Sequence, residues 1–416
     1  MANRFSQLGL LGSLYTAQLI PNMFFTVALP VYLRSRGASL ETVSLLSLLF
    51  LPWCFKFLWS PLVDRYGYTR WGHYRAWIFG TQSIAAVLIV ICALFDVQAH
   101  LGSLVGLMLL ITFFCATQDI ATDAFAVGLL PVGDREVGNG IQSMGGYLGS
   151  IIGAGGMLVL LDHWAWTPTM LLLAVVMILS MMPMLGVQER SVPSPAAPEP
   201  ASIWRYYGQQ FSAFCQRPGM KSWLLLLVLY ATGGSMGYTM LQPLMVDLGL
   251  SLGHIGWLLG IVGSGAGIGG AIAAIPLIRR LSRKWALSAI AILQAIVLLG
   301  CLLPALGLQQ TVVPVVILFH VGLGFASTIM HTTFMDRTTP TTAGFDYSFQ
   351  SSVSYIGGIG AAAISGLLVT HMGYPLFFGL CSLLSLLSIA VIYGCLGNIE
   401  PQSPILNPAE VASGQR

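Results

Sequence analysis

The sequence predicts an all-α integral membrane protein with twelve transmembrane helices. Hydrophobic residues make up 56% of the chain, charged residues make up 8%, and the mean hydropathy is +0.80, a composition typical of membrane proteins. Apolar runs of about 20 residues, enough to cross a bilayer as a helix, recur along nearly the whole chain, and they do not alternate polar with apolar residues as strands would. The expected helices span residues 8–33, 41–63, 76–95, 103–130, 137–161, 166–187, 221–247, 254–278, 285–306, 311–335, 347–371 and 375–397.

The positive charges predict the orientation of these helices. Most of the 18 Lys and Arg residues lie in the termini and in the loops after even-numbered helices, whereas Arg34 and Arg36 lie on the other side. Since cytoplasmic loops carry an excess of Lys and Arg, both termini should be cytoplasmic. This bias accounts for the net charge of +3, so we expect no nucleic-acid partner. The seven cysteines include no C-x-x-C pattern, and we expect neither a disulfide nor a zinc site.

The two halves of the chain repeat each other. Three pairs of short segments match in the same order and at nearly the same spacing: residues 37–43 with 249–255, 61–65 with 276–280, and 142–149 with 350–357. In the first pair, Ser39 and Ser251 are expected to cap the helices that follow. Six helices in each half give both halves the same orientation, and parallel six-helix repeats are the plan of major facilitator transporters. That plan implies a substrate site near mid-membrane between the halves and transport by alternating access.

A Pro-rich segment separates the halves. Residues 191–200 cannot form a regular helix and are expected to act as a flexible tether. After it, Trp204, Tyr207 and Phe211 are spaced three and four residues apart, which predicts a short amphipathic helix on the cytoplasmic surface. The expected parts are an N-terminal six-helix bundle at residues 1–187, a cytoplasmic linker with this helix at 188–220, a C-terminal six-helix bundle at 221–397, and a disordered cytoplasmic tail at 398–416.

Three ionisable residues lie inside otherwise apolar helices: Lys56 in the second, and Asp119 and Asp123 in the fourth. Such residues are expensive in a membrane and usually face the interior of the bundle, and a spacing of four places both aspartates on one helix face. Lys56 and Asp123 each lie eight residues from the cytoplasmic edge of their helix, which is about 12 Å at about 1.5 Å per residue. A Lys56 to Asp123 ion pair is therefore allowed.

Two interpretations of these charges remain open. They form a fixed ion pair that holds the second helix against the fourth, or an aspartate takes up and releases a proton during transport. Asp119 is the deeper residue and the first candidate for this role. The chain has no ATP-binding segment, so the energy must come from an ion gradient or from the substrate's own gradient. The aspartate pair predicts proton symport.

Polar residues at helical spacing outline a substrate cavity, with one stripe on the first helix and another on the seventh. The expected cavity residues are Tyr15, Gln18, Asn22, Gln118, Tyr230, Tyr238, Gln242, His331, Gln350 and Tyr355. Such a surface suits a polar, aromatic ligand of chelate size. The alternative for the stripes is hydrogen bonding between helices. No carboxylate or Cys accompanies the histidines at metal-ligand spacing, so we expect no metal site.

Two segments resemble one branch of the major facilitator superfamily. Residues 55–65 read Phe-Lys-Phe-Leu-Trp-Ser-Pro-Leu-Val-Asp-Arg, and residues 116–123 read Ala-Thr-Gln-Asp-Ile-Ala-Thr-Asp. Both are similar to the muropeptide-permease and acetyl-CoA-transporter branch. Residues 60–70 also resemble the superfamily's loop between helices two and three, with Ser60 in place of the usual first Gly. The resemblance implies a gate on the cytoplasmic side formed by Asp64, Arg65, Gly67 and Arg70.

Over its full length, the chain looks most like the single-protein siderophore permeases of bacteria, which import ferric pyochelin or rhizobactin. This resemblance implies a multi-pass protein of the bacterial inner membrane that imports a ferric siderophore without a cofactor. No short motif separates such proteins from muropeptide permeases, so a cell-wall fragment is the alternative substrate; fold analogy does not fix the ligand. Because one chain contains both halves, we expect a monomer surrounded by lipid.

Enzymes and sensors fit the sequence less well. It contains no G-x-S-x-G, H-E-x-x-H or P-loop motif, which argues against a membrane enzyme. Residues 265–270 fit G-x-G-x-x-G, but they lie within an apolar helix, so we reject nucleotide binding. A non-transporting sensor would more naturally carry a soluble output domain. The glycines instead predict close-packing helix faces, at Gly145, Gly149 and Gly153 in the fifth helix and at Gly256 and Gly260 in the eighth.

Overall fold

The computed structural model describes residues 4–66, 69, 72–97, 99–129, 135–186, 200–337 and 343–396. Within these ranges it contains eleven helices that are long and apolar enough to cross a membrane. The last of them, Asp346–Gly394, has 49 residues and is broken at Gly373, where φ is 75° and ψ is 162°. A positive φ of this size favours glycine. The break separates the expected eleventh and twelfth helices, so the predicted all-α membrane fold is confirmed.

The helices follow one another in two groups. The first group contains α1 (Arg4–Met23), η1 (Phe24–Ala28), α2 (Leu29–Ser35), α3 (Leu40–Leu45), η2 (Leu46–Phe50), α4 (Leu51–Phe55), η3 (Lys56–Leu58), α5 (Ser60–Arg65), α6 (Tyr74–Ala93), α7 (Leu101–Leu129), α8 (Arg135–Ser150), η5 (Ile151–Gly156), α9 (Met157–His163) and α10 (Trp166–Leu185). Helix α11 (Pro200–Gln216) follows between the groups. The second group contains α12 (Met220–Asp247), α13 (Leu252–Gly256), η6 (Trp257–Val262), α14 (Gly263–Arg280), α15 (Arg283–Gly300), α16 (Leu302–Ala305), η7 (Gln309–Thr311), α17 (Val312–Asp336) and α18 (Ala343–Leu396). The segments η1, η5 and η6 are π-helices, and η2, η3 and η7 are 3-10 helices.

Two serines of the internal repeat begin equivalent helices. The side chain of Ser39 accepts a hydrogen bond from the backbone N–H of Thr42 at the start of α3. The side chain of Ser251 accepts one from the backbone N–H of His254 at the start of α13. Both distances are 3.2 Å. The predicted caps are confirmed, and they sit at corresponding places in the two halves.

The second membrane span is not one regular helix. It runs through α3, η2, α4, η3 and α5, with Pro52 and Pro61 near the starts of α4 and α5. Proline has no N–H to donate and therefore interrupts the α-helical ladder. A 3-10 helix rises about 2.0 Å per residue, against about 1.5 Å in an α-helix. Lys56 is the first residue of η3, so it lies within the irregular part of this span.

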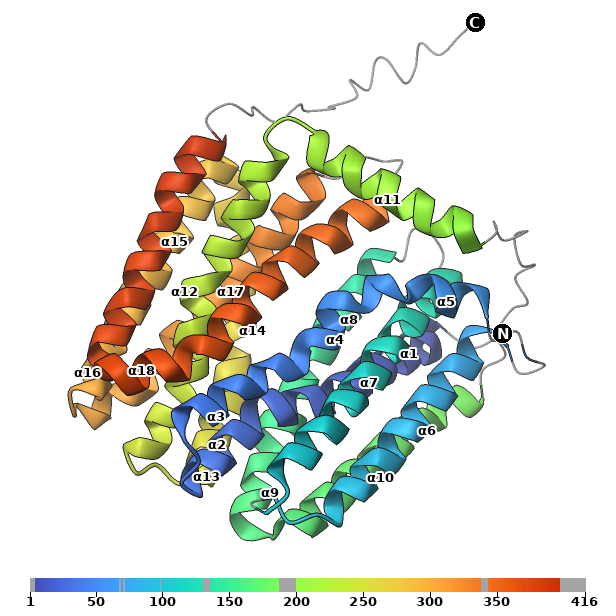
Figure 1. Cartoon of the computed structure of the whole chain (residues 1–416), viewed down its shortest axis with the longest axis horizontal. Helices are drawn as coiled ribbons and strands as arrows, with labels where there is room; N and C mark the ends of the chain where they lie inside the picture. The colour runs from blue at the N-terminus through green and yellow to red at the C-terminus, as the bar shows by residue number, and fades with distance from the viewer. Residues whose placement is uncertain are drawn as a thin grey trace, which may run out of the picture.

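The helices of residues 4–186 lie together, and those of residues 220–396 form a second group beside them (Figure 1). In the first group α1 packs against α7, α8 and α10; in the second, α12 packs against α18, and α17 packs against α14 and α15. This packing supports the proposed bundles at residues 1–187 and 221–397. The expected amphipathic helix lies within α11. Residues 187–199 and the tail from residue 397 lie outside the described ranges.

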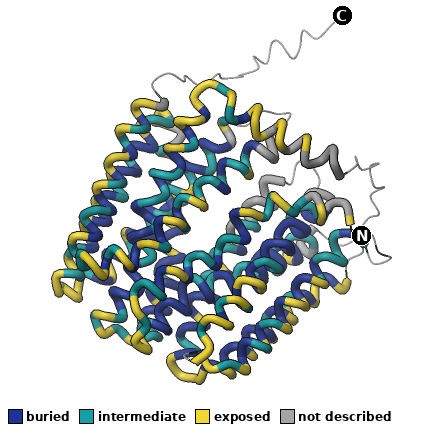
Figure 2. Tube along the Cα trace, viewed as in Figure 1, coloured by how far each residue is buried: buried dark blue, intermediate teal, exposed yellow. Residues whose placement is uncertain are grey.

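Apolar side chains cover much of the outer surface of the helices. Figure 2 shows exposed residues along the outward faces and buried ones where helices meet. The exposed fractions of Val87, Ile272 and Leu376 are 59%, 62% and 69%. An apolar surface of this extent would promote aggregation in water but is compatible with lipid. These faces are therefore expected to contact the lipid bilayer.

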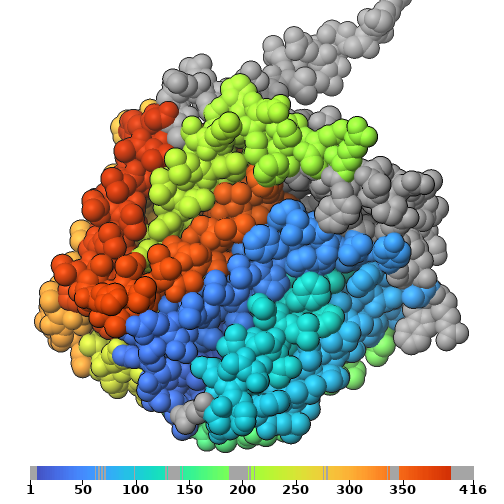
Figure 3. Space-filling view, viewed as in Figure 1, coloured from blue at the N-terminus to red at the C-terminus, as the bar shows by residue number. Residues whose placement is uncertain are grey.

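The two groups meet most closely at one end of the molecule. There α2 packs against α12, α3 against α18, and η5 against η6, and Figure 3 shows side chains of the blue first group directly against those of α18. At the η5–η6 crossing, a Cβ on Gly155 would lie 2.8 Å from Cα of Gly260 and 2.9 Å from the backbone oxygen of Gly256. Only glycines allow the backbones to approach this closely.

The predicted glycine faces both pack closely, but against different partners. Gly256 and Gly260 meet Gly155, which the sequence analysis did not single out. Gly149 and Gly153 instead pack within the first group: a Cβ on Gly149 would lie 2.8 Å from Cβ of Leu19 on α1. The face with Gly149 and Gly153 therefore holds helices of the first group together, whereas the face with Gly256 and Gly260 forms a contact between the two groups.

Polar contacts join the same end, which we call the closed end. The guanidinium of Arg34 donates to both carboxylate oxygens of Asp247, at 2.6 and 2.8 Å, and the hydroxyl of Tyr374 donates to Asp247 at 2.8 Å. The backbone N–H of Gly253 donates to Asp162 at 2.9 Å. These residues border the loops on the side where Lys and Arg are rare. The charge bias predicts that this side is not cytoplasmic.

Candidate functional site

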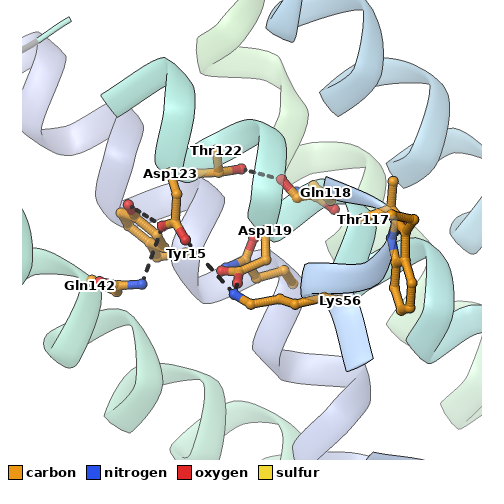
Figure 4. Close-up of polar contacts among 10 residues, drawn as sticks. Tyr15, Lys56, Thr117, Gln118, Asp119, Thr122, Asp123 and Gln142 are labelled. Atoms are coloured by element: carbon orange, nitrogen blue, oxygen red, sulfur yellow. Dashed lines mark hydrogen bonds and ion pairs between the residues drawn. The ribbon is translucent and has the colours of Figure 1, made fainter. Parts of the chain in front are cut away.

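The three intramembrane charges form one cluster (Figure 4). Lys56 of η3 donates from Nζ to Oδ2 of Asp119 on α7, and its Nζ lies 3.8 Å from Oδ2 of Asp123. The ion pair between Lys56 and Asp123 that the depths allowed is therefore present, and Asp119 is the nearer of the two carboxylates. Asp119 and Asp123 lie one turn apart on the same face of α7, so the long side chain of Lys56 lies within reach of both.

The two carboxylates of the cluster have different surroundings. The Asp119 side chain is 5% exposed, and it accepts hydrogen bonds from Lys56 and from Nε2 of Gln18 on α1. The Asp123 side chain is 41% exposed. It accepts from the hydroxyl of Tyr15 at 2.9 Å and from Nε2 of Gln142 on α8 at 3.3 Å. Asp119 therefore faces the closed interior, and Asp123 faces solvent.

Gln142 is a member of the site that the sequence analysis used only as part of the repeat. It corresponds to Gln350 in the second half, and nothing in the sequence around it indicated that its side chain would reach Asp123 on another helix. The carboxylates outnumber the ammonium group two to one in this cluster. The cluster consequently has an excess negative charge that a proton or a cationic group can balance.

The stripe on α1 lies along this cluster. Tyr15 and Gln18 each bind one of the aspartates. Asn22, one turn further along, is fully buried, and neither atom of its amide has a hydrogen-bond partner among the described residues. All three residues are buried, with exposed fractions of 4%, 1% and 0%, so in this conformation they are not open to a cavity, and their part in substrate binding stays a prediction.

Gln118 lies on α7 beside Asp119 but faces away from the cluster. It is fully buried, and its Nε2 donates to Oε1 of Gln82 on α6 at 2.8 Å. Gln82 in turn donates to the backbone oxygen of Met177 and to the hydroxyl of Ser180, both on α10. Adjacent residues of a helix point about 100° apart, so a neighbour of Asp119 is turned towards a different helix. Gln118 therefore joins α6, α7 and α10.

The expected cavity residues of the second group divide into buried and exposed ones. On α12, Tyr230 and Gln242 are 5% and 2% exposed, and the Tyr230 hydroxyl has no hydrogen-bond partner among the described residues. Tyr238 of the same helix is partly buried against other rings. Tyr355 on α18 is 39% exposed, and its ring lies 5.5 Å from that of Phe50 in the first group. Tyr355 is therefore a partly exposed aromatic side chain of the second group that contacts the first.

Gln350 and His331 have partners within the second group. Gln350 accepts from Nε1 of Trp223 at 2.7 Å and donates to the backbone oxygen of Phe334 at 3.2 Å, which joins α12, α17 and α18. Nδ1 of His331 donates to the backbone oxygen of Ser327 at 2.7 Å. No group of three His, Cys, Asp or Glu side chains that could hold a metal occurs in the described part of the chain. The hydrogen bonds of Gln350 therefore hold α12, α17 and α18 together.

The Trp223→Phe variant is expected to be less stable than the wild type by about 1–3 kcal/mol, because it leaves the buried amide oxygen of Gln350 without its donor. The measurement is thermal unfolding of the purified protein in detergent. Trp164→Phe, at a side chain that is 48% exposed, is the matched control and should leave the midpoint unchanged. Equal midpoints for both variants would contradict the assignment of Gln350 as a tie.

The expected cytoplasmic gate lies at the edge of the described structure. Asp64 and Arg65 are the last two residues of α5 (Ser60–Arg65), but their side chains are not among the described ones. Gly67 and Arg70 lie outside the described residues. The gate therefore stays a prediction.

A sequence model described as the Major Facilitator Superfamily matches residues 11–362 and, in a second match, residues 224–414. The chain belongs to the Major Facilitator Superfamily. It is therefore a multi-pass membrane transporter of a small molecule and not an enzyme, as the sequence predicted.

This superfamily member is 26% identical over 363 residues to the anhydromuropeptide permease of Escherichia coli (strain K12), which covers 86% of this chain and 73% of that protein. It is also 26% identical over 381 residues to an uncharacterized protein of Haemophilus influenzae, covering 88% and 89% of the two chains. Among solved structures, a POT family transporter in complex with a thioalcohol-conjugated peptide superposes with a TM-score of 0.71 at 15% identity, over 93% and 95% of the two chains. That similarity shows the transporter fold.

Proposed function

We propose that this protein is a secondary transporter of the bacterial inner membrane that imports an anhydromuropeptide-type fragment of the cell wall together with a proton. The observation that carries the coupling is the Lys56, Asp119 and Asp123 cluster, which places two carboxylates around one ammonium inside the membrane. The similarity to the anhydromuropeptide permease of Escherichia coli supports the substrate class. One chain supplies both halves, so it works as a monomer.

The contacts between the groups support a conformation that is closed on the non-cytoplasmic side. Arg34 and Asp247 join the groups at the closed end, while Asp123 and Lys56 keep side-chain exposures of 41% and 28%. In Figure 1 the two groups diverge towards the end where α11 lies. The cluster therefore faces the cytoplasm in this state, and opening of the closed end would expose it to the other side.

The geometry around Lys56 supplies a mechanism of coupling. An ionised Asp119 holds the ammonium of Lys56 within the cluster. A proton on Asp119 releases Lys56 towards Asp123 and the exposed side, where it can pair with a carboxylate of a peptide fragment. Substrate without a proton would instead add an unbalanced negative charge to a cavity that must close, which is strongly unfavourable. Movement of substrate therefore requires the proton.

The resemblance to siderophore permeases implied a ferric chelate as the substrate. None of the relatives described above is named as a siderophore permease, whereas the protein of Escherichia coli is named an anhydromuropeptide permease. We therefore propose the alternative substrate of the sequence analysis in preference to the siderophore. The ferric chelate remains the competing outcome of the experiment that follows.

The test is uptake into proteoliposomes that contain the purified protein, with a more acidic pH outside. A radiolabelled N-acetylglucosaminyl-anhydro-N-acetylmuramyl peptide is expected to accumulate, and collapse of the proton gradient should abolish the accumulation. Ferric pyochelin labelled with radioiron is assayed in the same vesicles, and protein-free vesicles are the control. Accumulation of the ferric chelate alone would overturn the proposed substrate; accumulation that survives an ionophore would overturn the coupling.

A further inference from the structure

Two buried amides lie on the closed-end side of the charge cluster without protein partners. Asn22 is fully buried, and both its Nδ2 and its Oδ1 lack a hydrogen-bond partner among the described residues. Gln18 donates to Asp119 from Nε2, but its Oε1 also lacks a partner there. A buried polar atom left unsatisfied costs about 1–3 kcal/mol. In native proteins such atoms are satisfied by the protein or by ordered water.

The amides of Gln18 and Asn22 lie one after the other along the first span, between the charge cluster and the closed end. Gln18 and Asn22 are four residues apart on α1 (Arg4–Met23) and therefore share a helix face, about 6 Å apart. The first span runs from α1 through η1 to Arg34 at the closed end. Asn22 thus lies between Asp119 and the closed end, whereas Asp123 lies on the exposed side of the same cluster.

The backbone next to Asn22 is irregular as well. The π-helix η1 (Phe24–Ala28) starts two residues after it, and short π-helical segments within α-helices frequently occur at functional sites. The hydroxyl of Thr26 donates back to the backbone oxygen of Asn22 at 2.7 Å. The first span therefore carries a further polar side chain in η1, one turn beyond the amide.

We propose that Gln18 and Asn22 bind ordered water and form the outer section of a proton route that reaches Asp119 from the non-cytoplasmic side. This inference rests on the proposed proton-coupled function. The amides do not titrate; they orient waters, each of which receives one proton and passes one on. The proton enters as hydronium from the open outer side, ends on a carboxylate oxygen of Asp119, and leaves the Lys56 ammonium unchanged. On the inner side it departs past Asp123.

The experiment compares Asn22→Leu, which keeps the side-chain size but removes the amide, with Asn22→Ser, which can still bind water. Each is assayed with the radiolabelled anhydromuropeptide for accumulation driven by a proton gradient and for counterflow, the exchange of substrate at equal pH. We expect Asn22→Leu to lose accumulation while its counterflow and apparent affinity match the wild type, and Asn22→Ser to keep both. Loss of counterflow in Asn22→Leu would make Asn22 a substrate contact or a folding residue, and unchanged accumulation would remove it from the proton route.

A second measurement needs no substrate. In X-ray hydroxyl-radical footprinting, bound water produces radicals next to buried side chains, so Phe25, which is fully buried and lies three residues from Asn22, is expected to be oxidised in the wild type and protected in Asn22→Leu. Equal oxidation in both proteins would overturn the water site. Wild-type vesicles that show no proton-driven uptake, together with a positive footprint, would instead overturn the proposed function and leave water bound at a site with no part in coupling.

Discussion

The Asp119→Asn variant is expected to lose accumulation driven by a proton gradient while it retains counterflow. Asn cannot carry the coupled proton or hold the ammonium of Lys56, which then pairs with Asp123 at the exposed side in every state. Without a membrane potential, a gradient of one pH unit sustains about tenfold accumulation through a one-proton symporter, because about 1.4 kcal/mol corresponds to tenfold. The variant should reach only equilibration under this gradient.

The measurement is uptake of the labelled fragment at fixed inner pH, with the outer pH lowered by one unit. Asp336→Asn serves as the matched control, because its ion pair with Arg283 is at the surface, with side-chain exposures of 44% and 32%, where such pairs contribute little. An Asp119→Asn protein that still accumulates substrate would show that the ion pair only holds the helices together. Removal of both partners, in Lys56→Met with Asp119→Asn, distinguishes a lost proton site from an unbalanced charge.

The Gly155→Leu variant is expected to shift the carrier away from the conformation with the closed end. The new Cβ would lie 2.8 Å from Cα of Gly260 and 2.9 Å from the backbone oxygen of Gly256, so relief requires the backbones of η5 and η6 to separate. Interfaces of this kind shift between discrete arrangements rather than deform gradually. The outer side should therefore be open in most molecules.

The distance between spin labels at Ser35→Cys and Leu306→Cys, in a background without the native cysteines, reports this opening, because both positions are exposed at the closed end. Gly265→Leu is the matched control, since a Cβ there meets no atom within 4 Å. It should keep the wild-type distance. A wild-type distance in Gly155→Leu would mean that the glycine crossing does not determine which side is closed.

The number and type of spans were predictable because they depend on apolar length and composition alone. The glycine faces and serine caps were predictable for a related reason, since both follow from local chemistry at a helix start or crossing. The ion pair between Lys56 and Asp123 was predictable from their depths, but the closer contact with Asp119 was not, because helix spacing does not fix the direction of a long lysine side chain between two carboxylates. Pro52 and Pro61 mark the irregular span in the sequence, but they do not say which residues adopt the 3-10 conformation.

The site itself was predictable in its charges and less so in its neutral members. Charged residues are so rare inside membrane helices that Lys56, Asp119 and Asp123 could be recognised from the sequence as candidate site residues. An amide such as Gln118 or Gln142 carries no comparable signal, since its role depends on a rotation of about 100° per residue and on which helix lies opposite. The first ties helices together and the second reaches the carboxylate, and only the packing of α6, α7 and α8 distinguishes them.

At Gly373 the chain turns sharply from the eleventh span into the twelfth, and no loop lies between them, as the bend of α18 shows (Figure 1). The next residue, Tyr374, is bound to Asp247 at the closed end. The connection between these two spans therefore offers a protease little extended chain to cleave. Because the connection is so short, we expect these two helices to insert into the bilayer together as one helical hairpin.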